Sequence, residues 1–270
     1  MYLTRHATPG GPRWARDGHY LPASFNLRLA LELPAAAARE LLAVLPAGEP
    51  ATDPPLAPLE PEQEVWASGV TYLRSRDARI AESLVKDVYD LVYEAERPEL
   101  FFKAAGWRVA GPGEPIRVRR DSAWNVPEPE LVVVFTRTLE IVGYTAGNDV
   151  SSRSIEGANP LYLPQAKIYD GATALGPGIL IHESSEFLAL PIRLVIRRGD
   201  AVIFTGETST AQMKRSPDDL VRWLGRELAF PWGGFLMTGT GIVPPDDFTL
   251  QPGDCVQITV GQLTLENAVI

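Results

Sequence analysis

Short runs of apolar residues recur along the second half of the chain, and their pattern predicts a fold made mainly of β-strands. From residue 100 onward these runs are rich in Val, Ile, Thr and Phe, and Gly- and Pro-rich turns separate them. The predicted strands cover residues 131–136, 141–146, 178–182, 192–196, 201–206 and 255–260. Because strands and helices do not alternate regularly, the pattern argues against a Rossmann fold or a TIM barrel. We expect an α+β fold, predominantly β, with an antiparallel or mixed sheet.

Apolar residues at helical spacing predict three helices. Residues 35–45, with the sequence AAAARELLAVL, are strong helix formers, and a second helix is expected across residues 74–94. The third covers residues 218–228 and has two candidate N-cap residues, Ser216 and Asp218. Helices are therefore expected to be a minority beside the strands.

Prolines divide the chain into two predicted units. Six of them fall within residues 46–62, where they disfavour both helix and central strand, so this stretch is predicted to be a linker. Before it, residues 25–33 have the pattern of a strand that precedes the first helix. We therefore expect a small N-terminal α/β module with its linker at residues 1–62, and a larger domain at residues 63–270.

Composition and charge exclude several classes of function. The 270 residues carry 34 acidic and 25 basic side chains, a net charge of −9, which does not favour nucleic-acid binding. Cys255 is the only cysteine, so the chain has neither an internal disulfide nor a multi-cysteine zinc site. The start of the chain lacks the apolar core of a signal peptide, and no apolar run approaches the roughly 20 residues of a membrane span. We expect a cytoplasmic protein with no nucleic-acid or membrane partner.

Two glutamates at the start of a predicted strand are the first candidates for chemistry. Glu128 and Glu130, in WNVPEPELVVVF, are separated by one residue, so their side chains share a face of the strand. Two adjacent carboxylates repel each other, and a hard divalent ion between them relieves that repulsion. Asp149 ends the next predicted strand, and a turn near Arg137 brings it beside the pair. The alternative is that the glutamates are solvated charges that protect a strand end from edge pairing.

Several motifs together resemble the fumarylacetoacetate hydrolase superfamily. The likeness runs from residue 64 to residue 270. It is carried by ASGVTY at 67–72, EPE at 128–130, GYTAGNDVSSR at 143–153, QAKIYDGATALGP at 165–177 and MTGTGIVPPDDFTLQPGD at 237–254. As a set these motifs are specific, and a smaller N-terminal region before the core is usual in the superfamily.

The resemblance implies a mixed β-roll catalytic domain and a metal-dependent reaction on a 2-oxo acid. It implies Mg²⁺ as the cofactor, with Mn²⁺ or Ca²⁺ as alternatives, and a homodimer or homotetramer. The site residues that it implies are the metal ligands Glu128, Glu130 and Asp149, the active-site lysine Lys167, and the substrate-contacting residues Arg153 and Thr240.

Two departures from the hydrolytic pattern narrow the expected activity. Hydrolytic members carry a His–Glu pair after the tyrosine of the first motif, but the segment after Tyr72 reads LRSRDAR and has no histidine. ERPELFFK at 96–103 and SIEGANPLYLPQAKIYDG at 154–171 are instead similar to the branch that dehydrates 2-keto-3-deoxy pentonates. In that branch a glutamate of the PELFFK strand works with the active-site lysine, and here it is Glu99. The alternatives are a surface carboxylate at Glu99 and a solvated loop lysine at Lys167.

The chemistry of such a substrate fits these residue types. The carboxylate and adjacent carbonyl of a 2-keto-3-deoxy sugar acid chelate an octahedral ion, which acidifies the C3 protons by stabilising the enolate. Loss of a C3 proton and the C4 hydroxyl, followed by a second proton shift, gives 2,5-dioxopentanoate, and Lys167 and Glu99 are the expected proton carriers. Two other functions stay open at this point: an acylpyruvate or fumarylpyruvate-type C–C bond hydrolase, and a catalytically silent, metal-stabilised binding protein.

Overall fold

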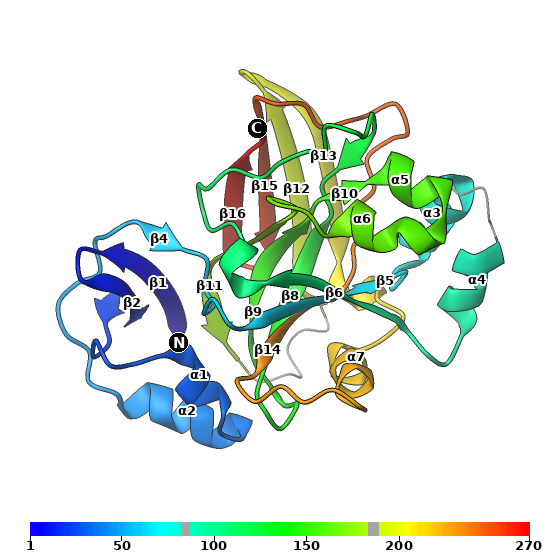
Figure 1. Cartoon of the computed structure of the whole chain (residues 1–270). Helices are drawn as coiled ribbons and strands as arrows, with labels where there is room; N and C mark the ends of the chain where they lie inside the picture. The colour runs from blue at the N-terminus through cyan, green and yellow to red at the C-terminus, as the bar shows by residue number, and fades with distance from the viewer. Residues whose placement is uncertain (83–86, 183–188) are drawn as a thin grey trace.

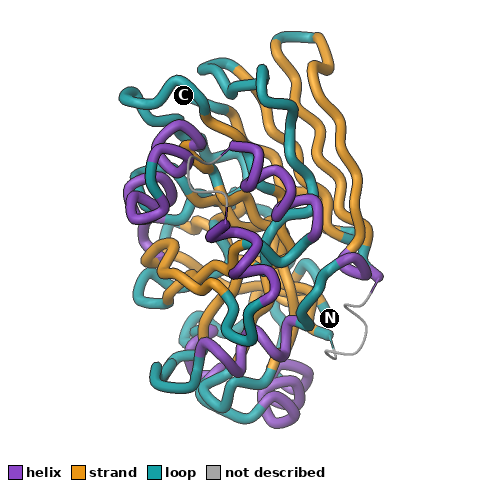
Figure 2. The backbone as a smooth tube through the Cα atoms, turned by 90° about the vertical axis from the view of Figure 1, so that its right-hand side faces the viewer, coloured by secondary structure: helices purple, strands orange, loops and turns teal. Residues whose placement is uncertain are grey.

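β-Strands form the framework of the molecule, as the computed structural model of the chain shows for residues 1–82, 87–182 and 189–270 (Figure 1). A large sheet crosses the molecule, a smaller sheet packs beside it, and helices lie around them (Figure 2). This architecture confirms the predicted α+β, predominantly β, fold class. No helix in the described part of the chain is both long and apolar enough to cross a membrane.

The large sheet has ten strands in the described residues. Their order is β3-β2-β1-β11-β9-β8-β14-β5-β6, with β4 paired to β1. The strands are β1 (Tyr2–Thr8), β2 (Gly11–Arg16), β3 (His19–Tyr20), β4 (Pro55–Leu56), β5 (Glu64–Gly69), β6 (Glu99–Ala105), β8 (Pro129–Phe135), β9 (Ile141–Asp149), β11 (Thr173–Ile181) and β14 (Gly234–Met237). β5 and β14 run parallel, whereas the other paired strands are antiparallel, so the sheet is mixed as expected.

Strands β8 and β9 lie in the middle of the sheet and are buried on both faces. Leu131 and Val133 pack into a core shared with the smaller sheet. Val132 and Val134 point the other way, into a core that includes residues of two N-terminal helices, α1 (Leu27–Leu31) and α2 (Ala35–Val44). A strand covered on both sides has no solvent-facing position, which explains its uninterrupted apolar sequence.

The smaller sheet contains four strands in the order β13-β12-β15-β16. They are β12 (Pro191–Arg198), β13 (Ala201–Ser209), β15 (Asp254–Val260) and β16 (Leu263–Ala268). Buried and exposed residues alternate along β16, because one face packs on the large sheet and the other faces solvent. A separate pair of short strands, β7 (Asn125–Val126) and β10 (Ser151–Ser152), borders the end of the β8–β9 hairpin.

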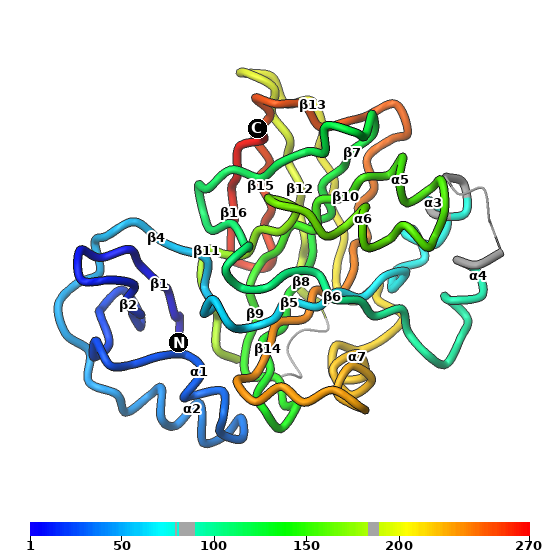
Figure 3. Tube along the Cα trace, in the orientation of Figure 1, coloured from blue at the N-terminus to red at the C-terminus, as the bar shows by residue number. Residues whose placement is uncertain are grey.

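Three helices gather beside one end of the large sheet. They are α3 (Leu73–Glu82), α5 (Arg153–Ala158) and α6 (Leu163–Lys167), and the traces of all three lie side by side (Figure 3). The 3₁₀ turn Pro160–Tyr162 joins α5 to α6, and α4 (Asp87–Glu94) packs on α3. The remaining elements are α7 (Pro217–Leu224) and the 3₁₀ turns Gly106–Arg108 and Thr210–Gln212. The Ser216 side chain caps α7 by accepting a hydrogen bond from the backbone N–H of Asp219, as one of the two predicted caps.

The structure corrects two features expected from the sequence. The predicted strand at residues 25–33 is wrong, because the side chain of Asn26 accepts a hydrogen bond from the N–H of Arg28 and starts helix α1. The predicted helix at 74–94 is two helices, α3 and α4, and residues 83–86 between them lie outside the described residues.

The proline-rich stretch at residues 46–62 is partly built into the sheet and the core. Its residues 55–56 form β4, and Ala57 and Leu59 are buried. Upstream of it, β1 pairs with β11 and so extends the large sheet. The division of the chain at residue 62 stays a prediction.

Candidate active site

The β8–β9 hairpin brings three carboxylates together at its open end. Glu130 pairs with Gly147 across the hairpin, and the backbone N–H of Asp149 donates to the carbonyl of Glu128 over 3.0 Å. One oxygen from each of Glu128, Glu130 and Asp149 lies within 4.8 Å of the others, and all three side chains are buried. The two-residue spacing on β8 and the turn of the β8–β9 hairpin therefore bring these three side chains together, as the sequence predicted.

Burial and neighbouring charges both act on Glu130. Burial raises the pKa of Glu130 well above its ordinary range, and the nearby charges of Asp149 and Glu128 raise it further. Two interactions oppose this: the positive charge of Lys167, and the backbone N–H of Gly239, which donates to Glu130 Oε2 over 2.6 Å. Gly239 has φ +92°, and a Cβ there would lie 2.0 Å from Thr71 Oγ1, so the close approach of this loop requires glycine.

Lys167 reaches into the carboxylate cluster from the end of α6. Its Nζ lies 2.9 Å from both Glu128 Oε2 and Asp149 Oδ2, and it donates to Ser151 Oγ over 2.6 Å. The side chain is buried. The Pro-rich segment before Lys167 is thus a short helix that ends at the site.

A second buried lysine, Lys103 on β6, contacts the same cluster from another side. Its Nζ lies 2.6 Å from Asp149 Oδ1. It also approaches the carbonyl oxygens of Val150 and Lys167, so it holds the strand end and the end of α6 together. Burial lowers the pKa of Lys103, while the Asp149 carboxylate opposes that shift. Sequence reasoning did not single out Lys103; the available signal was a lysine inside the apolar strand ELFFKAA.

The donor chemistry of the cluster fits a hard divalent cation. Three carboxylates at mutual distances within 4.8 Å supply the oxygen ligands that Mg²⁺, Mn²⁺ or Ca²⁺ prefers. Burial and the charges of Asp149 and Glu128 raise the pKa of Glu130 even with Lys167 at the cluster, so a divalent cation would add charge compensation there. Arg153, the predicted substrate-contacting arginine, lies 3.2 Å from Glu128 Oε1 and is buried behind the cluster.

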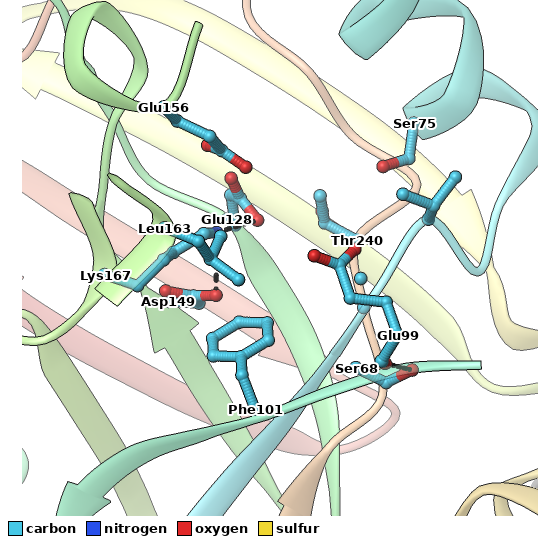
Figure 4. A pocket seen from close by; sticks show the side chains of 13 residues that line it. Ser68, Ser75, Glu99, Phe101, Glu128, Asp149, Glu156, Leu163, Lys167 and Thr240 are labelled. Atoms are coloured by element: carbon cyan, nitrogen blue, oxygen red, sulfur yellow. Dashed lines mark hydrogen bonds and ion pairs between the residues drawn. The ribbon is translucent and has the colours of Figure 1, made fainter. Parts of the chain in front are cut away.

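A cleft opens over the cluster (Figure 4). Lys167, Asp149 and Glu128 form one side of it, and Glu99 and Thr240 form the other. Further lining residues are Ser68, Ser75, Phe101 and Glu156. No histidine is among the described residues that line this cleft.

Glu99 reaches the cleft because β5 carries a glycine opposite it. Glu99 is the first residue of β6 and pairs with Gly69 on β5. A Cβ on residue 69 would lie 2.0 Å from Glu99 Oε2, so the carboxylate occupies the space that a side chain would fill. The structure thus gathers Glu99, Thr240 and Lys167 around one cleft, whereas Glu130 and Arg153 are not among its lining residues.

Sequence comparison identifies the family. The model of the fumarylacetoacetate (FAA) hydrolase C-terminal family matches residues 70–270. A Haloferax volcanii protein named probable 2-keto-3-deoxyxylonate dehydratase is 51% identical over 209 residues, which cover 77% of this chain and 72% of that protein. The 2-dehydro-3-deoxy-D-arabinonate dehydratase of Saccharolobus solfataricus is 44% identical over 211 residues, or 76% of this chain and 70% of the relative.

Solved structures agree with the sequence relatives. A 2-keto-3-deoxyarabinonate dehydratase superimposes with a TM-score of 0.87 at 35% identity, over 100% of this chain and 99% of the other. A structure of 2-keto-3-deoxy-D-arabinonate dehydratase complexed with magnesium and 2,5-dioxopentanoate superimposes with a TM-score of 0.85 at 36% identity, over 100% and 98% of the two chains. The match to the family model and these relatives confirm the resemblance seen in the motifs, and the chain belongs to the fumarylacetoacetate hydrolase family.

Proposed function

We propose that this protein is a metal-dependent dehydratase that converts a 2-keto-3-deoxy pentonate, of the arabinonate or xylonate type, into 2,5-dioxopentanoate. The observation that carries the proposal is the buried cluster of Glu128, Glu130 and Asp149 with Lys167 on one side of the cleft and Glu99 on the other. The relatives with the highest identity above bear the names of dehydratases for these sugar acids.

The carboxylate cluster is proposed to hold Mg²⁺. Glu128, Glu130 and Asp149 would supply its protein ligands, and the magnesium complex of the related dehydratase supports this choice. When bound, the ion supplies Lewis-acid chemistry, because it polarises the keto group and stabilises the enolate form of the substrate. Mn²⁺ and Ca²⁺ remain alternatives with the same ligand chemistry.

Proton transfer is assigned to Lys167 and Glu99. The dehydration needs one group to remove a C3 proton and one to protonate the departing C4 hydroxyl, and a second shift then moves a proton from C5. Lys167 Nζ lies directly at the carboxylate cluster, so it is placed beside C2 and C3 of a substrate that binds there. Glu99 faces it across the cleft beside Thr240, on the side where C4 and C5 would extend (Figure 4).

A hydrolytic reaction would need a group that activates water. Histidine is the usual general base for that task, and the described lining residues include none. Ser75 lies on α3 in the segment after Tyr72, where hydrolytic members of the superfamily carry a His–Glu pair. The cleft therefore favours elimination of a substrate hydroxyl over attack by water.

The test is a direct comparison of two substrates in the presence of Mg²⁺. The purified protein should consume 2-keto-3-deoxyarabinonate or 2-keto-3-deoxyxylonate, with 2,5-dioxopentanoate as product, and leave an acylpyruvate intact. Glu130→Gln should abolish turnover, because one ligand and its charge are lost. Consumption of the acylpyruvate alone would support the hydrolase, and consumption of neither substrate would support the silent binding protein.

We propose in addition that the protein works as a homodimer or homotetramer in the cytoplasm. Val202 and Ile203 on β13, an edge strand of the smaller sheet, expose 55% and 37% of their surface, which provides an apolar surface for a second copy. Light scattering of the purified protein measures the assembly size directly, and a monomer at micromolar concentration would refute it.

A further inference from the structure

We infer that Ser75 binds the terminal C5 hydroxyl of the sugar acid and thereby selects hydroxylated substrates. This inference rests on the proposed function, since it names the part of the same cleft that recognises the distal end of the substrate. It concerns binding alone and assigns Ser75 no part in proton transfer.

Ser75 is a buried polar residue that points into the cleft. It lies in the first turns of α3, is 95% buried, and lines the cleft together with Glu99 and Thr240. Figure 4 shows its hydroxyl directed inward, on the side of the cleft opposite Lys167. In the described residues its hydroxyl has no hydrogen-bond partner. The hydroxyl opens onto the cleft, so a ligand hydroxyl that enters the cleft can replace solvent as its hydrogen-bond partner.

The direction of the substrate follows from the charges in the cleft. The carboxylate and keto group belong at the Glu128, Glu130 and Asp149 cluster through the bound cation, and the reacting C3 and C4 atoms then lie between Lys167 and Glu99. The end of the substrate that remains is C5 with its hydroxyl, which extends toward α3. A serine hydroxyl both donates and accepts hydrogen bonds, so it can pair with another hydroxyl in either direction.

A second serine in the cleft provides a matched control. Ser68 on β5 also lines the cleft, but its hydroxyl donates to the backbone carbonyl of Glu99 over 3.0 Å. Its role is therefore to fix the start of β6, and its loss should affect substrates equally whether or not they carry a C5 hydroxyl. Ser75→Ala and Ser68→Ala each remove one hydroxyl group from the cleft. The Ser68 hydroxyl is bonded to the protein backbone, whereas the Ser75 hydroxyl faces the cleft.

The experiment compares two substrates that differ at C5 only. 4-Hydroxy-2-oxopentanoate has a methyl group in place of the C5 hydroxymethyl group. It can lose a C3 proton and its C4 hydroxyl as water, which leaves 2-oxopent-3-enoate, and the reaction ends there because C5 carries no oxygen. kcat/KM is measured for this analogue and for 2-keto-3-deoxyarabinonate with Mg²⁺, using wild type, Ser75→Ala, Ser75→Cys and Ser68→Ala.

Ser75→Ala should lower kcat/KM for the sugar acid by about 10-fold and for the analogue by less than about 2-fold. Ser75→Cys, which replaces the hydroxyl with a slightly larger thiol that forms only weak hydrogen bonds, should show the same selective loss. The inhibition constant of 2-oxopentanoate, which lacks both hydroxyls, should not change in any variant, as a sign that the cluster and the fold are intact.

An equal loss on both substrates, no loss on either, or a changed inhibition constant for 2-oxopentanoate would overturn the assignment of Ser75. Wild-type protein that consumes neither substrate would instead overturn the proposed function, and this inference with it.

Discussion

The carboxylate of Glu99 occupies the space beside β5 that a side chain on residue 69 would fill, because a Cβ at Gly69 would lie 2.0 Å from Glu99 Oε2. Gly69→Ala must therefore displace this carboxylate from the cleft. We expect kcat to fall by about 10- to 100-fold, since small displacements of a reacting group have effects of that size. Mg²⁺ affinity, measured by calorimetry, should stay unchanged because the three proposed ligands lie on other strands.

Gly48→Ala is the matched control for this substitution. A Cβ at Gly48 would meet no atom closer than Tyr20 O at 3.5 Å, which is an ordinary contact. This variant should keep wild-type kcat. Normal kcat in Gly69→Ala as well would show that the position of Glu99 is unimportant for turnover.

The buried pair of Lys103 and Asp149 is expected to dominate the stability of the site. With Nζ and Oδ1 2.6 Å apart and both side chains almost fully buried, Lys103→Met removes one of the two lysines that neutralise Asp149 and leaves Lys167 alone to do so. We expect a loss of about 3–5 kcal/mol in the free energy of unfolding of the metal-free protein. Mg²⁺ should raise the melting temperature of Lys103→Met more than that of wild type, because the cation replaces part of the lost charge.

Lys214→Met tests whether that effect depends on burial. Lys214 pairs with Glu94 over 3.1 Å, but both side chains are partly exposed, so the substitution should change stability by less than about 1 kcal/mol. Urea unfolding with and without Mg²⁺ measures all of these changes. A Lys103→Met protein as stable as Lys214→Met would contradict the structural role of Lys103.

The parts of the site that were predictable from sequence depend on short-range geometry. Glu128 and Glu130 share a strand face at a spacing of two, and a tight hairpin fixes Asp149 opposite them, so local rules bring the cluster together. Helix α2 was equally predictable from the sequence, because the periodic apolar pattern that indicates a helix is local.

The features that sequence reasoning missed depend on partners far along the chain. Strand β1 has no strict apolar alternation, and it joins the large sheet by pairing with β11, where Leu3 lies opposite Ile179. The role of Lys103 depends on its contact with Asp149, which is 46 residues away in the sequence and is brought close by the position of β6 in the sheet. Likewise, α5 and α6 lie in a Pro-containing segment with little periodicity, and packing beside the hairpin end determines where they form.

The raised pKa of Glu130 predicts how pH affects the metal-free protein. Burial, with the charges of Asp149 and Glu128, raises the pKa of Glu130 well above 4.5, so the folded protein keeps a proton that the unfolded chain releases. The free energy of unfolding should therefore fall as pH rises from the ordinary carboxyl pKa toward the raised one, by up to about 1.4 kcal/mol per pH unit. Glu130→Gln should remove this contribution, because the amide does not titrate.

Urea unfolding in a chelator at several values between pH 5 and pH 8 measures the dependence. Glu40→Gln, on the exposed face of α2, serves as the control and should leave the slope as it is in wild type. A slope that persists unchanged in Glu130→Gln would assign the pH dependence to another group.

Lys167 contacts the same carboxylate oxygens that would bind a divalent cation. Replacing this lysine should therefore strengthen Mg²⁺ binding and abolish turnover. Its Nζ lies 2.9 Å from both Glu128 Oε2 and Asp149 Oδ2. Lys167→Met removes a positive charge from the cluster, so Mg²⁺ affinity should rise by at least about 10-fold while turnover is lost. Ser151→Ala removes the 2.6 Å hydrogen bond from Nζ and the 2.8 Å hydrogen bond to Glu128 Oε1 but no charge, so its effect on Mg²⁺ affinity should be much smaller than that of Lys167→Met. Calorimetric titration of Mg²⁺ into the two variants decides the point, because weaker binding to Lys167→Met would mean that the lysine organises the ligands and does not compete with the ion.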